Sequence, residues 1–186
     1  MRRLLALFLT LMLALLPLSA LAEMEEDVAI DKITAMIQSA LDAEEFTYDL
    51  EDTGYFVLTY DSTNGALGDI YAFLDVYDGA VLIYACYEED VPPDRIDETA
   101  KFMNLFNGEV LGTKYFIMPD SGTIFYELPF FLDSEHLGDY EANQVLELLN
   151  SVVADIDYDV EYFMEIIGGE TAENVFAMFL ADYYRE

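Results

Sequence analysis

The stretch "NLFNGEVLGTKYFIMPDSGTIFYE", residues 104–127, joins the two kinds of regular structure that decide this fold. Its first residues end an apolar stripe with helical spacing, and Gly108 is a residue type that often follows a helix. The segments 113–118 and 122–128 then alternate as strands do, and Pro119 and Gly122 suit the turn between them. The stretch offers no candidate nucleophile, so we interpret it as a scaffold that supports contacts and carries no reaction.

The same patterns extend outward from this stretch in both directions. Pro92-Pro93 precedes the helix, where a proline in the first turn needs no hydrogen-bond partner. Asp78-Gly79 is the strongest hairpin signal in the chain, because both turn positions tolerate a positive φ. We predict a helix at about 28–42 and strands at 46–52, 54–61, 69–77 and 80–88, with tight turns near 52–54 and at 78–79.

The C-terminal part of the chain is predicted to be helical. An apolar stripe runs from Val145 to Ile167, Gly168-Gly169 ends it, and Thr171 suits the cap of a last helix. Consecutive strands with short turns indicate antiparallel pairing. The predicted fold class is therefore α+β: an antiparallel sheet with an N-terminal helix, a central helix and C-terminal helices.

Both faces of the predicted sheet are apolar. In the strand 69–77 the even-numbered residues form a core face, while Tyr71, Phe73 and Tyr77 point to the other side, and Tyr84 joins them from the next strand. Exposed aromatic patches of this kind mark partner sites. Three occupants of the second face stay open: the C-terminal helices of the same chain, a second copy in a homodimer, or a protein or peptide partner. The candidate binding surface is Tyr71, Phe73, Tyr77 and Tyr84.

Residues 1–22 have the features of a secretory signal peptide. Arg2 and Arg3 precede an apolar run that is shorter than a bilayer span, and Ala20-Leu21-Ala22 provides a cleavage pattern. The expected mature chain, 23–186, has the size of a single domain. We expect a secreted or periplasmic protein that is free of the membrane after cleavage.

The chain is strongly acidic, with a formal net charge of −31 at pH 7. All acidic residues follow the predicted cleavage site, where only five lysines and arginines oppose them. Such a surface repels nucleic acids and anionic membranes, because it cannot release counterions from phosphates. The many tyrosines and phenylalanines argue against disorder, so the acids are expected to coat a folded domain.

Residues that could support catalysis or hold a cofactor are few. Cys86 is the sole cysteine and lies within an apolar strand, which predicts a buried, unreactive thiol. His136 is the sole histidine, lies in a polar segment and has no triad motif around it. One histidine and one cysteine do not fill a zinc site. We therefore expect no enzyme activity, no catalytic residues, no cofactor and no metal centre.

Carboxylates leave two weaker alternatives. The loop 61–69 and the segment 155–161 are rich in oxygen ligands, so an acidic surface or structural protein with weak calcium binding stays open. In the second segment only Asp155 and Asp159 would share a helix side, which we interpret as a solvated face. A carboxylate-dependent hydrolase would need a deep cleft that holds two acids.

The order helix, strands, helix, hairpin and helices resembles the YbjN-like group, which is related in fold to type III secretion chaperones. The resemblance covers about residues 28–150 and lies in Asn104 and Asn107 at the helix end, the strands 113–118 and 123–128, and the turn Asp120-Ser121-Gly122. It implies a small acidic module, often dimeric, that binds protein segments without chemistry of its own. Two features depart from it: the signal peptide and the longer C-terminal helices. The expected function is an exported, chaperone-like protein- or peptide-binding module.

Overall fold

The fold is described from a computed structural model of the chain. The structure describes residues 28–51, 55–133 and 135–185. The predicted signal peptide and the predicted turn at 52–54 lie outside the described residues. Within the described ranges no helix combines the length and the apolar character needed to cross a bilayer.

The elements follow the predicted order and confirm the α+β class. The described part of the chain begins in a helix that covers residues 28–43. It continues with β1 (Tyr48–Leu50), β2 (Phe56–Tyr60), β3 (Ile70–Tyr77), β4 (Ala80–Tyr87), α2 (Ile96–Glu109), β5 (Lys114–Ile117), β6 (Ile124–Phe131), α3 (Asp139–Ile167) and α4 (Ala172–Tyr183).

The strands form one antiparallel sheet in the order β1-β2-β3-β4-β6-β5. The first four strands are neighbours in sequence, and Gly79, with φ +70°, closes the predicted β3–β4 hairpin. After α2 the chain returns as a hairpin whose second strand, β6, pairs with β4. This leaves β5 at the edge of the sheet.

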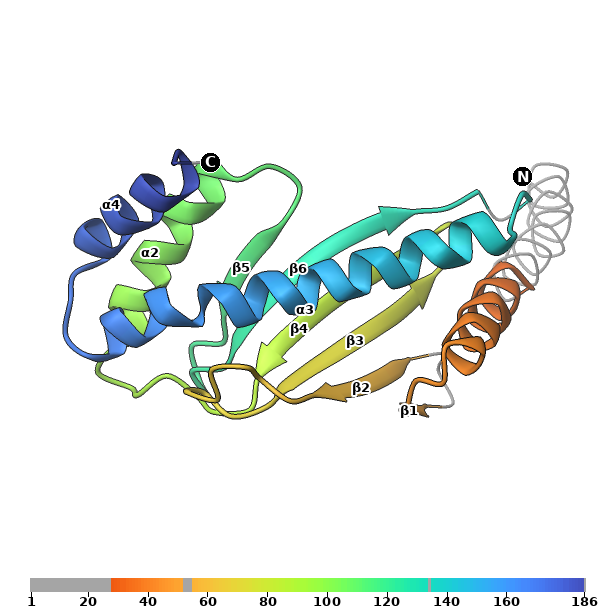
Figure 1. Cartoon of the computed structure of the whole chain (residues 1–186), viewed down its shortest axis with the longest axis horizontal. Coiled ribbons are helices and arrows are strands. Elements are labelled where there is room, and N and C mark those ends of the chain that lie inside the picture. Colours follow the sequence, from red (N-terminus) through yellow and green to blue (C-terminus); the bar gives the residue numbers. More distant parts are fainter. Residues whose placement is uncertain (1–27, 52–54, 134, 186) are drawn as a thin grey trace, which may run out of the picture.

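The core lies between one face of the sheet and the helices. In Figure 1, α3 crosses the sheet, the helix 28–43 lies near one end of α3, and α2 and α4 lie beyond the other end. The even-numbered residues of β2, β3 and β6 and the odd-numbered residues of β4 point into this core, as the alternation predicted. Their main partners are the buried apolar side chains Ile33, Ile37, Leu41, Val145, Leu149, Val152 and Ile156.

The C-terminal helices do not cover the second face of the sheet, so that alternative is wrong. The apolar stripe of α3 packs on the core face, where the hydroxyl of Tyr87 donates to the carbonyl of Ile156 at 2.5 Å. The turn after α3 then directs α4 toward α2, and α4 packs against α2 and α3. The single apolar stripe of α3 can pack on only one face of the sheet, and it packs on the core face.

The end of α2 also differs from the prediction. The helix continues through Gly108 to Glu109, and the residue with positive φ is Gly112, at +94°. Asn107 explains the extension. Its side chain accepts from the backbone N–H of Tyr115 at 2.8 Å and donates to the carbonyl of Tyr115 at 2.7 Å. One amide therefore pairs with the edge strand β5 and occupies groups that another strand would need.

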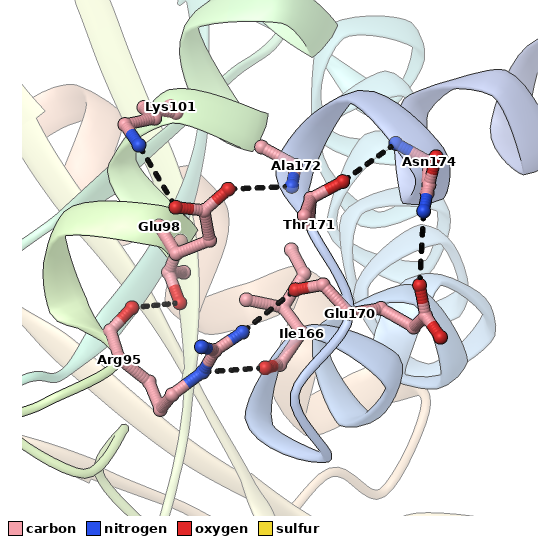
Figure 2. Close-up of polar contacts among 9 residues, drawn as sticks. Arg95, Glu98, Lys101, Ile166, Glu170, Thr171, Ala172 and Asn174 are labelled. Atoms are coloured by element: carbon pink, nitrogen blue, oxygen red, sulfur yellow. Dashed lines mark hydrogen bonds and ion pairs between the residues drawn. The ribbon is translucent and has the colours of Figure 1, made fainter.

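A polar clamp, Arg95 and Glu98, fixes the turn between α3 and α4 to the start of α2 (Figure 2). Arg95 donates to the carbonyls of Ile166 and Glu170, both at 2.7 Å, and so ties the end of α3 and the turn after it to the start of α2. Glu98 accepts from the N–H of Ala172 at 2.7 Å, a contact that lowers the pKa of Glu98.

Two further contacts in Figure 2 stabilise the start of α4 and the position of Glu98. Thr171 caps α4 as predicted, because its hydroxyl accepts from the N–H of Asn174 at 3.3 Å. Lys101 also pairs with Glu98, at 2.8 Å. The direction of α4 therefore depends on two side chains that precede it by more than 70 positions in sequence.

Substituting Arg95→Met is expected to lower the free energy of unfolding by about 1.5–3 kcal/mol, because the partly buried bond to Ile166 and the exposed bond to Glu170 both lose their charged donor. Urea denaturation measures the loss. Lys101→Met is the matched control: it also removes one positive charge and breaks only an exposed pair, so its expected cost is much smaller than that of Arg95→Met. Equal losses in the two variants would show that the clamp does not hold α4.

Candidate functional site: the aromatic face of the sheet

The face of the sheet opposite the core is built from the alternate residues of its strands. The pairing register aligns these residues in rows that run across the sheet. One row contains Val57, Phe73, Tyr84, Glu127 and Lys114. The buried apolar residues of the described helices belong to the core cluster on the other face, and the aromatic residues of this face are not part of that cluster. The rows are therefore open to a partner.

Five aromatic rings form a continuous ladder on this face. Tyr55 lies 5.6 Å from Phe73, and Phe73 stacks on Tyr84 at 4.8 Å, measured between ring centroids. Tyr84 lies 6.1 Å from Phe125, and Phe125 stacks on Phe116 at 5.1 Å. We call these five residues the aromatic ladder. All five are half-buried, so each ring keeps part of its surface for a ligand.

The four predicted surface residues all lie on this face, but they do not form one cluster. Phe73 and Tyr84 are the centre of the ladder. Tyr71 lies in the adjacent row, opposite Cys86. Tyr77 lies at the end of β3, is 49% exposed, and donates its hydroxyl to Asp75 at 2.5 Å. The first two residues therefore define the centre of the surface, and the other two lie away from it.

Sequence reasoning missed Tyr55, Phe116 and Phe125. The alternation in 54–61 was sufficient to place Tyr55, because Phe56 and Leu58 must point to the core. The two phenylalanines needed the strand order as well. They join the ladder only because β6 pairs with β4, which puts Phe125 opposite Cys86.

The ladder combines apolar surface with hydroxyl groups. Tyr84 donates to the hydroxyl of Tyr55, and burial raises the pKa of the Tyr84 phenol, which keeps it neutral at physiological pH. The acids Asp75 and Glu127 flank the rings, with Lys114 opposite Glu127 in the register. Aromatic faces beside carboxylates are suited to lysine and arginine side chains.

Cys86 lies beneath this surface as a free thiol. It is 6% exposed, and burial raises its pKa to about 11. The prediction that Cys86 is buried is confirmed. The raised pKa disfavours the thiolate, which is the reactive form.

The loop 61–69 is held to α3 by hydrogen bonds. Asp157 accepts from the hydroxyl of Ser62 at 2.6 Å and from the N–H of Thr63 at 3.1 Å. Weak calcium binding stays a prediction. Among the described residues, Asp133, Glu135 and His136 bring three ligand atoms within 4.8 Å of one another. All three side chains are exposed, and His136 pairs with Asp133 at 2.8 Å.

The interpretation of Asp155 and Asp159 as one solvated face is wrong for Asp159. Asp155 is exposed, but Asp159 is only 7% exposed and accepts from the hydroxyl of Tyr115 at 3.0 Å. The rotation of α3 that buries Val152 and Ile156 also turns Asp159 toward the sheet. Burial, together with the nearby charge of Asp155, raises the pKa of Asp159 to about 7.

No family model matches the chain, and no curated protein matches its sequence. The chain is similar in fold to the crystal structure of YbjN from E. coli, a protein put forward as a transcription regulator. The TM-score is 0.51 at 12% sequence identity, over 68% of this chain and 90% of YbjN. The predicted resemblance is confirmed as a likeness of fold, which carries no residue roles.

Proposed function

We propose that this chain is an exported, non-enzymatic module that binds a basic, extended segment of another protein on the aromatic ladder. The observation that carries the proposal is the continuous row of rings on a sheet face that the described helices leave open. Stacking rings supply contact area at low entropic cost. Export rests on the features of residues 1–22.

Charge favours a basic partner over a second copy of the chain. Each copy carries a net charge of −31, so two facing copies repel each other, whereas a segment rich in lysine and arginine is attracted. Asp75 and Glu127 lie beside the aromatic ladder, so they would attract lysine and arginine side chains to the ladder. A homodimer through the same face is the competing outcome of the test below.

The regulatory role put forward for YbjN is not carried over as direct DNA contact. Phosphate contacts need clustered lysines and arginines, and this chain has seven in all against 38 acidic residues. A role as an acidic surface protein with weak calcium binding remains the second candidate, supported by the same charge.

Export predicts a defined N-terminus. The protein recovered from a secreting host is expected to begin at Glu23, because cleavage follows the small residues Ala20 and Ala22. Intact-mass measurement and N-terminal sequencing check this. A full-length protein retained with the membrane would contradict the proposed export.

Replacing Phe73 with glutamate is expected to weaken binding of basic peptides by roughly tenfold or more, because a charge replaces the central stacked ring. The probes are synthetic extended peptides of equal length with lysine, neutral or glutamate residues between apolar ones. Fluorescence anisotropy measures affinity at fixed ionic strength. Wild type is expected to bind the lysine peptide in preference to the glutamate peptide.

Tyr140→Glu is the matched control for this experiment. Tyr140 is 68% exposed in the first turn of α3 and takes no part in the ladder. The control should keep wild-type affinity, and equal loss in both variants would refute the ladder as the binding surface. Light scattering measures the molar mass in solution and so tests for a homodimer. If the wild type is a dimer and Phe73→Glu is a monomer, this face binds a second copy of the chain instead.

A further inference from the structure

A second feature of the fold has the composition of a binding site and lies on the helical side, away from the aromatic ladder. A cavity of about 280 Å³ opens between α2, β6, α3 and α4. Its walls include the rings of Phe106, Tyr162 and Phe179 and the carboxylates of Asp159 and Asp182. The described lining contains no lysine, arginine or histidine, so Asp159 has no cationic partner within it.

Asp159 is the deepest charged group of this cavity. It is more than nine-tenths buried, and the hydroxyl of Tyr115 binds its Oδ2 at 3.0 Å. Its Oδ1 has no hydrogen-bond partner among the described residues, although the carboxylate lines the cavity. The Oδ1 atom is not among the enclosed unpaired atoms of the described residues, so it opens into the cavity, where a cation can reach it.

Two further carboxylates lie around Asp159. Asp155, one turn earlier on α3, accepts from the hydroxyl of Tyr126 at 3.2 Å and is an exposed residue of the cavity lining. Asp182 lines the cavity from α4, accepts from the hydroxyl of Tyr162 at 3.3 Å and pairs with Arg185 at 3.4 Å. The cavity thus combines three acids from two helices with an aromatic wall.

This arrangement favours an organic cation over a metal ion. Calcium and magnesium need several oxygen ligands around one point. In the described part of the chain, Asp155, Asp159 and Asp182 do not bring their oxygens within 4.8 Å of one another. Aromatic walls also supply no metal ligands, but they attract alkylammonium groups through the ring faces.

We propose that this cavity binds an alkylammonium group, carried by a small free amine or by a lysine side chain of a partner. The ammonium pairs with the free oxygen of Asp159, and the alkyl chain packs against Phe106 and Phe179. Asp182 and Asp155 hold a second cationic end where the ligand has one. The volume is sufficient for a chain of a few carbon atoms.

The carboxylates are less suited to glycoside hydrolysis. That reaction needs two acids on either side of the scissile bond. Asp155 and Asp159 lie one turn apart on the same helix, and each already accepts a tyrosine hydroxyl. Their position on one wall suits pairing with a cation.

Isothermal titration with putrescine (1,4-diaminobutane) at pH 8 and fixed ionic strength tests the proposal. Saturable binding at one site is expected, together with a rise in the thermal midpoint. Asp159→Asn and Asp182→Asn should each weaken binding by about tenfold or more. 1,4-Butanediol, which has the same chain without charge, should not bind. A lysine-containing peptide, titrated in parallel, distinguishes a lysine side chain from a free amine.

Glu161→Gln is the matched control, because it removes one exposed charge from α3 outside the cavity. It should bind putrescine as wild type does. The proposal is overturned if putrescine and the peptide both fail to saturate, if the diol binds equally well, or if Glu161→Gln loses as much affinity as Asp159→Asn. The last result would mean that only the overall charge attracts amines.

Discussion

Substituting Gly122→Ala is expected to lower the free energy of unfolding by about 3 kcal/mol or more. Gly122 has φ +92°, and a Cβ at this position would lie 2.4 Å from the carbonyl oxygen of Val91. Positive φ alone costs about 1 kcal/mol or more. The clash adds to this cost because its partner is backbone, which also pairs with Gly122 through the N–H of Val91 at 3.0 Å.

Gly112→Ala separates the two contributions. Gly112 has almost the same φ, +94°, but nothing lies within 4 Å of an added Cβ. Its expected cost is about 1 kcal/mol, and the difference between the two variants in urea denaturation measures the close approach of the β5–β6 turn to Val91. If both variants lose the same stability, the turn and the segment after β4 are not in contact.

Asp159→Asn is expected to stabilise the protein above neutral pH by about 2–4 kcal/mol and to leave it unchanged near pH 4. Burial raises the pKa of Asp159 to about 7 from its ordinary value of 3.8. Well below its ordinary pKa of 3.8 the carboxyl is protonated in both the folded and the unfolded chain, and near pH 4 the two states still differ little. As the pH rises toward 7 only the unfolded chain releases the proton freely, so Asp159 progressively destabilises the fold.

The groups that face Asp159 strengthen this effect. Tyr115 from β5 can bond to either protonation state, and asparagine keeps an acceptor for its hydroxyl. Asp155 on α3 and Asp182 on α4 are acidic, and Tyr126 from β6 and Tyr162 from α3 are neutral. None of these groups compensates an ionised Asp159.

Denaturation of wild type and Asp159→Asn at several pH values between 4 and 8 measures the predicted dependence. Glu161→Gln again serves as the control for general relief of repulsion in a chain with a net charge of −31. A difference between wild type and Asp159→Asn that stays constant from pH 4 to pH 8 would contradict a raised pKa at Asp159.

Local sequence patterns predicted the elements well where their cause is local. The Asp78-Gly79 turn, the alternation in β3 and β4 and the cap of α4 by Thr171 all depend on neighbours within a few residues. The predicted end of α2 before Gly108 was wrong because the actual end depends on a contact that is not local. Asn107 pairs with Tyr115 across the start of the next strand, and this tertiary contact sustains α2 to Glu109.

In the candidate sites, too, local patterns predicted some residues, and tertiary contacts determined the others. The alternation along β3 was enough to place Tyr71, Phe73 and Tyr77 on one face, with Tyr84 beside them. It did not bring Phe125 and Phe116 to Tyr84, because that depends on the pairing of β6 with β4. The cavity was missed altogether, since Asp159 and Asp182 come from helices whose packing no local pattern encodes.

By itself, the sequence determined the α+β class, the antiparallel hairpins and a sheet with two apolar faces, because turn residues and side-chain periodicity act over short distances. Only the tertiary structure decided which face the helices bury, which rings stack on the other face, and which carboxylate is removed from water. The reason is that the apolar stripe of α3 can cover one face only, and its rotation on that face buries Asp159 along with the stripe.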